Sequence, residues 1–182
     1  MSDSLMAAEL SPAGGTWAGL LFDNPGIGLA PQLTWTFTFD YREVSRDYGN
    51  VEPNLVIDWV PLHGGSWRNM MGQQASGAAF AEPIESSVYF FEHFRFDRAE
   101  LRIDEQRGND LHLAATVDGD IDDLGLAAVT AEGWLAFAGI TVALTGLEPP
   151  VDRALARLSE FTDTTGLAGS WTGRSFHFAP TA

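Results

Sequence analysis

The sequence contains no cysteine and no lysine. Without cysteine, disulfide bonds, thiolate metal sites and a cysteine nucleophile are excluded. All ten basic residues are arginines, and they face 25 acidic residues, which gives a net charge of −15 at pH 7. This charge argues against nucleic acid and anionic membranes as partners, and it favours a basic protein partner because charges steer association over long distances. The alternative is an acidic surface that serves only solubility.

Long hydrophobic runs are also missing. No stretch approaches the length of a membrane-spanning helix, and the first fifteen residues carry no basic and apolar regions typical of a signal peptide. Hydrophobic residues still make up 45% and aromatic residues 12% of the chain, which indicates a folded protein with a sizeable core. We therefore expect one cytoplasmic domain over residues 1–182, with a flexible N-terminal segment at 1–13.

Catalytic and nucleotide-binding motifs are absent as well. The sequence has no Gly-X-Ser-X-Gly elbow, no P-loop and no dinucleotide fingerprint. We expect a non-enzymatic protein that requires no cofactor.

Alternation of apolar and polar residues is the main pattern in the sequence. Residues 32–42 alternate strictly, which is typical of a strand with one buried face. Segments 54–62, 86–97 and 133–144 also favour strands, and the sequence Arg-Gly-Asn-Asp at 107–110 predicts a tight hairpin turn. Gly139 interrupts its strand, which indicates a bulge or a close backbone approach.

Only residues 149–161 have a helical period. Their apolar positions form one stripe, and Pro150 suits a first helical turn. The sequence therefore predicts an all-β, mainly antiparallel protein of eight to ten strands. We expect a calycin-like barrel or a β-sandwich with this amphipathic helix before the last strand.

A glycine, a hydroxyl residue and a tryptophan occur in that order three times, ending at Trp17, Trp67 and Trp171. Because large aromatic residues at strand starts pack more often than they bind, we expect Trp17 and Trp171 to close the core. Trp67 lies in a glycine-rich polar segment beside His63 and Arg68, so it is the copy that we expect to contact a ligand.

The first copy, at 15–17, resembles the Gly-X-Trp motif in the first strand of the calycin superfamily, which includes lipocalins, fatty-acid-binding proteins, avidins and nitrobindins. The order of strands, helix and final strand is also similar to that of a lipocalin. The resemblance covers the two ends of the chain. It implies a β-barrel closed at one end by Trp17, with Arg174 from a late strand packed beside that ring.

Three hypotheses for function follow. The first is a binding protein that holds a small apolar or aromatic ligand in the barrel, with Trp35, Phe37 and Phe90 among the ligand contacts. The second is an acidic interaction module, of the immunity or inhibitor type, that neutralises a basic partner.

The third hypothesis is a small β-barrel enzyme. Glu92 falls on the same predicted strand face as Val88, Phe90 and Phe94, where loss of water would raise the pKa of its carboxyl. Glu92 and the adjacent His93 are therefore the candidate acid and base. Pairing of Glu92 with an arginine, or its rotation into water, is the structural alternative.

Metal sites have little support in the sequence. Asp118, Asp120 and Asp122 alternate as in a calcium loop, but Asp123 and Val129 stand where an EF-hand needs glycine and glutamate. The alternative is a solvated acidic turn. The four histidines lack metal-ligand spacing, so we expect no metal centre.

Overall fold

A computed structural model describes residues 5–78 and 84–181. Its order of elements begins with a 3-10 turn at Ala7–Glu9 and includes a second at Pro25–Ile27. The strands are β1 (Pro12–Asn24), β2 (Leu29–Tyr41), β3 (Val44–Arg46), β4 (Gly49–Val51), β5 (Asn54–Val60), β6 (Gln74–Ala78), β7 (Glu85–Phe90), β8 (Glu92–Arg107), β9 (Asp110–Asp120), β10 (Ala128–Ala143), β11 (Leu167–Trp171) and β12 (Phe176–Pro180). The helix α1 (Val151–Leu158) precedes the last two strands.

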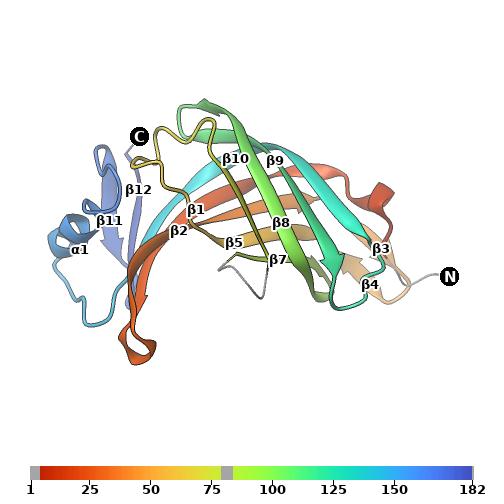
Figure 1. The fold of residues 1–182 in the computed structure, drawn as a ribbon, viewed down its shortest axis with the longest axis horizontal. Helices are drawn as coiled ribbons and strands as arrows, with labels where there is room; N and C mark the ends of the chain where they lie inside the picture. Colours follow the sequence, from red (N-terminus) through yellow and green to blue (C-terminus); the bar gives the residue numbers. More distant parts are fainter. Residues whose placement is uncertain (1–4, 79–83, 182) are drawn as a thin grey trace.

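Seven strands of the described chain close a barrel in the order β1-β2-β5-β7-β8-β9-β10 (Figure 1). Neighbouring strands in this order are antiparallel. Because an odd number of alternating strands returns in the starting direction, β10 pairs with β1 in parallel. The prediction of a mainly antiparallel, all-β fold with one helix is confirmed, and the open choice between barrel and sandwich is decided for the barrel.

The long strand β10 also carries the sheet beyond the barrel. Its first half pairs with β9, while its second half pairs with β1 on one side and β12 on the other. The hairpin β11–β12 and helix α1 therefore lie outside the barrel, at the end far from the N-terminus (Figure 1). The helix occupies the predicted segment but ends at Leu158, and two strands follow it instead of one.

Two glycines allow close contacts between strands. A Cβ atom at Gly15 would collide with the carbonyl oxygen of Thr38 on β2, so the first Gly-hydroxyl-Trp copy needs glycine for strand packing. Gly139 has a φ of 101°, and a Cβ atom there would lie 2.5 Å from the Phe178 carbonyl oxygen. This confirms the predicted close approach in that strand.

Inward-facing side chains fill the barrel. The alternation read from residues 32–42 places Trp35, Phe37, Phe39 and Tyr41 inside, each at most 3% exposed. Leucine, isoleucine and valine side chains from β5, β8, β9 and β10 complete the core. No helix of the described residues is long and apolar enough to cross a membrane.

Candidate functional site

A cluster of four aromatic rings closes one end of the barrel. Trp17 lies with its ring centroid 5.3 Å from that of Trp35 and 4.4 Å from that of Phe137. Phe137 in turn stacks on Trp67 at 4.5 Å, with 13° between the ring planes. The three tryptophans are at most 2% exposed. The structure therefore brings Trp17, Trp35 and Trp67 together as packing residues.

The segment around Trp67 is fixed across this end by hydrogen bonds. The Trp67 backbone N–H donates to the Thr162 hydroxyl at 3.1 Å, and its indole N–H donates to the Asp163 carbonyl at 2.9 Å. The Gln106 amide donates to the Trp67 carbonyl and accepts from the Met70 N–H, at 2.9 and 2.8 Å. Every polar group of Trp67 is thus satisfied within the chain.

Arg68 and His63, predicted to bind a ligand together with Trp67, lie in different surroundings. The Arg68 guanidinium lies 4.5 Å from the Trp67 ring centroid and donates to the Thr165 carbonyl at 2.8 Å. His63 is exposed. Arg68 therefore covers a packed ring, and Trp67 offers no free surface to a ligand in this conformation.

The third Gly-hydroxyl-Trp copy, which ends at Trp171, differs from the first two. Trp171 lies in the edge strand β11, is 39% exposed, and contacts Phe176 at 4.6 Å. Arg174 lies in the turn between β11 and β12, and none of the cation–π contacts of the described residues joins it to Trp17. The expectation that Trp171 plugs the core is not met, because β10 and β12 separate its strand from β1.

Glu92 and His93 face opposite sides of the sheet. Glu92 is opposite Phe90 across the β7–β8 hairpin, so it has the inward orientation predicted from its neighbours. It is the first residue of β8, however, and its side chain is exposed at the rim of the barrel. The desolvation required for an acid or base is therefore absent. His93 is exposed on the outer side, opposite Tyr89.

The three aspartates predicted as calcium ligands already have partners within the chain. Asp118 forms an ion pair with Arg98, and Asp120 accepts the backbone N–H groups of Leu124 and Gly125. Asp122 accepts from the Arg95 side chain and backbone, which lowers the pKa of its carboxyl to about 2. No cluster of metal-ligating side chains occurs in the described ranges.

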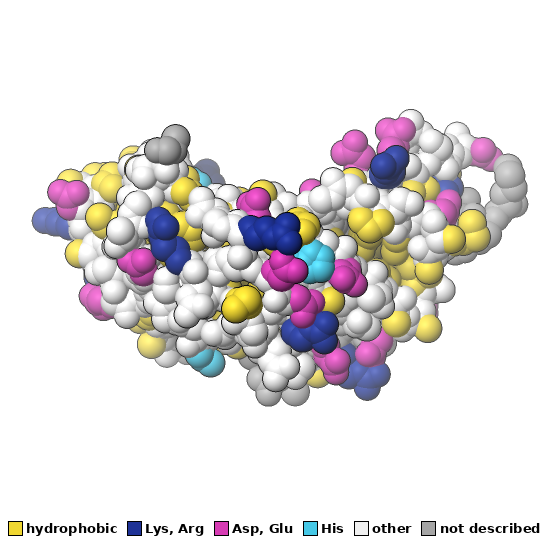
Figure 2. All heavy atoms as spheres, turned by 90° about the horizontal axis from the view of Figure 1, so that it is seen from above, with side chains coloured by type: hydrophobic (Ala, Val, Ile, Leu, Met, Phe, Trp, Pro, Cys, Tyr) yellow, Lys and Arg dark blue, Asp and Glu magenta, His cyan; other side chains and the backbone are white. Residues whose placement is uncertain are grey.

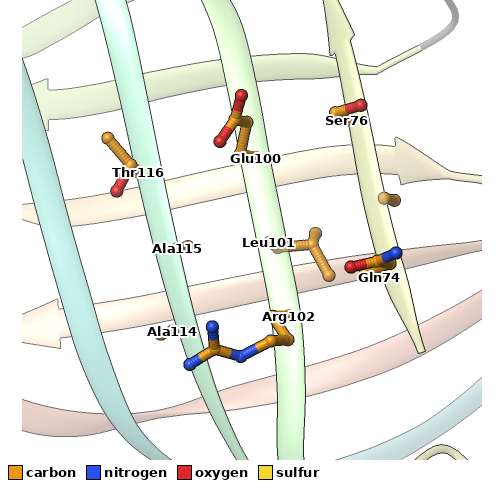
Figure 3. A pocket seen from close by; sticks show the side chains of 9 residues that line it. Gln74, Ser76, Glu100, Leu101, Arg102, Ala114, Ala115 and Thr116 are labelled. Carbon is orange, nitrogen blue, oxygen red and sulfur yellow. The ribbon is translucent and has the colours of Figure 1, made fainter. Parts of the chain in front are cut away.

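An open hollow of about 610 Å³ lies on the outside of the barrel over β6, β8 and β9 (Figure 3). Glu100 and Arg102 from β8 point in different directions beside Gln74 and Ser76 of β6. Arg102 donates to Asp104 at 2.5 Å, which lowers the pKa of that carboxyl. No aromatic side chain lines the hollow, so it lacks the apolar walls usual for a small-ligand pocket.

The other end of the barrel is closed by the N-terminal segment and the β3–β4 hairpin. Leu5 is 2% exposed, and the Glu9 carboxylate accepts two hydrogen bonds from Arg46 at 2.9 and 2.8 Å. The Arg46 guanidinium lies 5.0 Å from the ring centroid of the buried Phe90. Within residues 5–13, Leu5 and Glu9 therefore hold the segment against this end of the barrel. The flexibility expected of residues 1–13 stays a prediction, and residues 1–4 lie outside the described residues.

Two aromatic rings reach the surface at this end. Tyr48, in the β3–β4 turn, is 58% exposed, and its ring centroid lies 4.8 Å from that of Phe91. Phe91 joins β7 to β8 in the left-handed region, with a φ of 62°. This conformation is costly for a bulky residue, and such strain concentrates at functional sites. We call Tyr48 and Phe91 the aromatic tip.

Exposed carboxylates flank the aromatic tip in the sequence and also lie elsewhere at this end of the barrel. Asp47 precedes Tyr48, and Glu92 follows Phe91. Further acids line a hollow of about 500 Å³ at the ends of β2 and β5, together with Arg42. Five exposed carboxylates at this end form no ion pair within the described residues: Asp40, Glu43, Asp47, Glu52 and Glu92. Figure 2 shows hydrophobic, acidic and basic side chains intermixed over this end of the molecule.

The aromatic tip was not among the predicted site residues. Two consecutive phenylalanines at 90 and 91 interrupt the alternation of 86–97, and this interruption was the available signal for a turn. The contact between Tyr48 and Phe91 joins residues 43 positions apart, so no local pattern contains it.

No family model, curated protein or solved structure matches this chain.

Proposed function

We propose that this protein is a non-enzymatic binding protein that captures a basic protein partner on its acidic outer surface. The observation that carries the proposal is how the charges are distributed. Seven of the ten arginines form ion pairs within the described chain, while most of the described carboxylates, including the five at the end that carries the aromatic tip, form none. A cationic partner would supply the missing counter-charges and be attracted from a distance.

The packed interior supports a role for the outer surface. Trp35, Phe37 and Phe90 were predicted to contact an enclosed ligand. Trp35 and Phe37 are at most 2% exposed, and Phe90 is 4% exposed. A small apolar ligand inside the barrel would have to displace such rings. That function stays a prediction, as does the calycin relationship, which is supported by the Gly-Thr-Trp of β1 and by closure of the barrel through that strand.

Affinity capture from the native cell lysate at about 50 and 500 mM salt tests the proposal. The higher concentration shortens the distance over which charges attract to a few ångströms, so it should weaken a charge-driven complex. Captured proteins are identified, purified and titrated individually against the immobilised protein. We expect a basic protein that binds at low salt and is released at high salt. Absence of a basic partner, or binding insensitive to salt, would contradict the proposal.

A further inference from the structure

The aromatic tip combines two features of binding surfaces. Tyrosine and other aromatic residues are enriched at the energetic centres of protein interfaces. Here Tyr48 is 58% exposed although its ring packs on Phe91, so the ring has a support on one neighbour and stays largely uncovered. An anchor that is ordered before binding loses little conformational entropy when a partner arrives.

Phe91 combines a costly backbone conformation with a ring that packs against the core. Glycine or asparagine adopts a φ of 62° at lower cost, and the turn holds phenylalanine instead. The ring of Phe91 contacts Phe90 at 5.1 Å on one side and Tyr48 at 4.8 Å on the other. Phe91 thus supports the exposed tyrosine from the core.

The surrounding charges select the chemistry of the partner. Asp47 and Glu92 flank the two rings in the sequence, and both side chains are exposed. A guanidinium group can stack on an aromatic face and donate paired hydrogen bonds to a carboxylate at the same time. Within this chain Arg46 already lies over Phe90, the ring next to Phe91.

We infer that the aromatic tip, with Asp47 and Glu92 at its rim, docks an arginine-rich segment of a protein partner. The inference rests on the proposed function and assigns it to one end of the barrel. A guanidinium of the segment stacks on Tyr48, and neighbouring arginines pair with the rim carboxylates.

Synthetic octa-arginine is the probe, titrated by isothermal calorimetry at about 50 mM salt against the full chain and four variants. Tyr48→Ala removes the exposed ring, and Asp47→Asn with Glu92→Gln removes the rim charges. Trp171→Ala removes an exposed ring far from the tip, and Glu100→Gln with Glu132→Gln removes two exposed charges from β8 and β10. Circular dichroism melts confirm that each variant folds.

We expect each tip variant to weaken octa-arginine binding about fivefold, from the energies of exposed cation–π contacts and ion pairs. Each distant variant should change it less than about twofold. Octa-lysine should bind the unmodified protein more weakly than octa-arginine, and Tyr48→Ala should reduce that difference because the guanidinium stacks better than an ammonium group.

Equal weakening by tip and distant variants, or equal binding of octa-lysine and octa-arginine, would overturn the inference while leaving an acidic binding surface elsewhere. Failure of octa-arginine to bind the unmodified protein would overturn it as well. The proposed function falls separately, if lysate capture yields no basic partner.

Discussion

The two ends of the barrel are closed in opposite ways. At one end Trp67 is fully buried, stacks on Phe137, and has every polar group hydrogen bonded. At the other end Tyr48 is exposed, Phe91 has a left-handed backbone, and carboxylates lie without counter-ions. The first end is thus closed by buried, hydrogen-bonded residues, whereas the second leaves an aromatic ring and carboxylates uncovered. Left-handed bulky residues occur at both ends, since Trp59, beside the Val60 partner of Trp35, has a φ of 61°.

The second end has one further cost. The Tyr41 hydroxyl is buried and has no hydrogen-bond partner among the described side chains and backbone, and burial raises its pKa to about 12. A buried unpaired hydroxyl destabilises the native state because it loses its bonds to water. The difference between the ends can therefore be tested by mutation, starting with the end that Trp67 closes.

Trp67→Ala should have the largest effect. Loss of the Trp67 ring leaves a cavity beside Phe137. We expect a loss of about 4 kcal/mol in the free energy of unfolding, measured by urea denaturation. Trp171→Ala is the matched control, since its ring is 39% exposed, and should cost about 1 kcal/mol or less. Similar losses in both variants would remove the distinction between a buried closure and a surface ring.

Tyr41→Phe should stabilise the protein by about 1 kcal/mol at neutral pH by removing the unpaired hydroxyl. The effect should grow in alkali. Tyrosine in the unfolded chain loses its proton near pH 10, whereas folded Tyr41 keeps it to about pH 12, so the native protein loses about 1.4 kcal/mol of stability per pH unit between these values.

The phenylalanine variant lacks this loss, while contributions from the other tyrosines cancel in the comparison. Urea denaturation of both proteins from pH 7 to 12 measures the gap between them. A gap that stays constant with pH would show that Tyr41 does not titrate as its burial implies.

Phe91→Gly and Phe91→Ala separate backbone strain from the loss of the ring. Both variants remove the same ring contacts, but only alanine keeps the cost of a left-handed conformation. We expect the glycine variant to be more stable than the alanine variant by about 1 kcal/mol in thermal or urea unfolding, the reverse of their order in an ordinary strand. The usual order would mean that Phe91 carries no strain.

Tyr48→Ala should change stability least, by less than about 0.5 kcal/mol, because its side chain is largely exposed. Thermal melting measures this change. A large loss would mean that Tyr48 is part of the closure of its end, and the contrast between the two ends would then be smaller than the exposures indicate.

Much of the fold was predictable because its signals are local. Alternation in residues 32–42 identified the inward face of β2, and the Gly108-Asn109 turn identified the β8–β9 hairpin. The orientation of Glu92 was also predicted correctly. Its exposure was not, because the turn at Phe91 places Glu92 at the rim, and the length of a strand inside a barrel is not a local property.

The sequence by itself determined the strand faces, the late helix, the acidic charge and the absence of cysteine chemistry. These depend on residue type and on spacing along the chain. Only the tertiary structure decided barrel closure, the separation of Trp17 from Trp171, and the meeting of Tyr48 with Phe91. These depend on which strands pair, and that choice is made by packing between residues far apart in the chain.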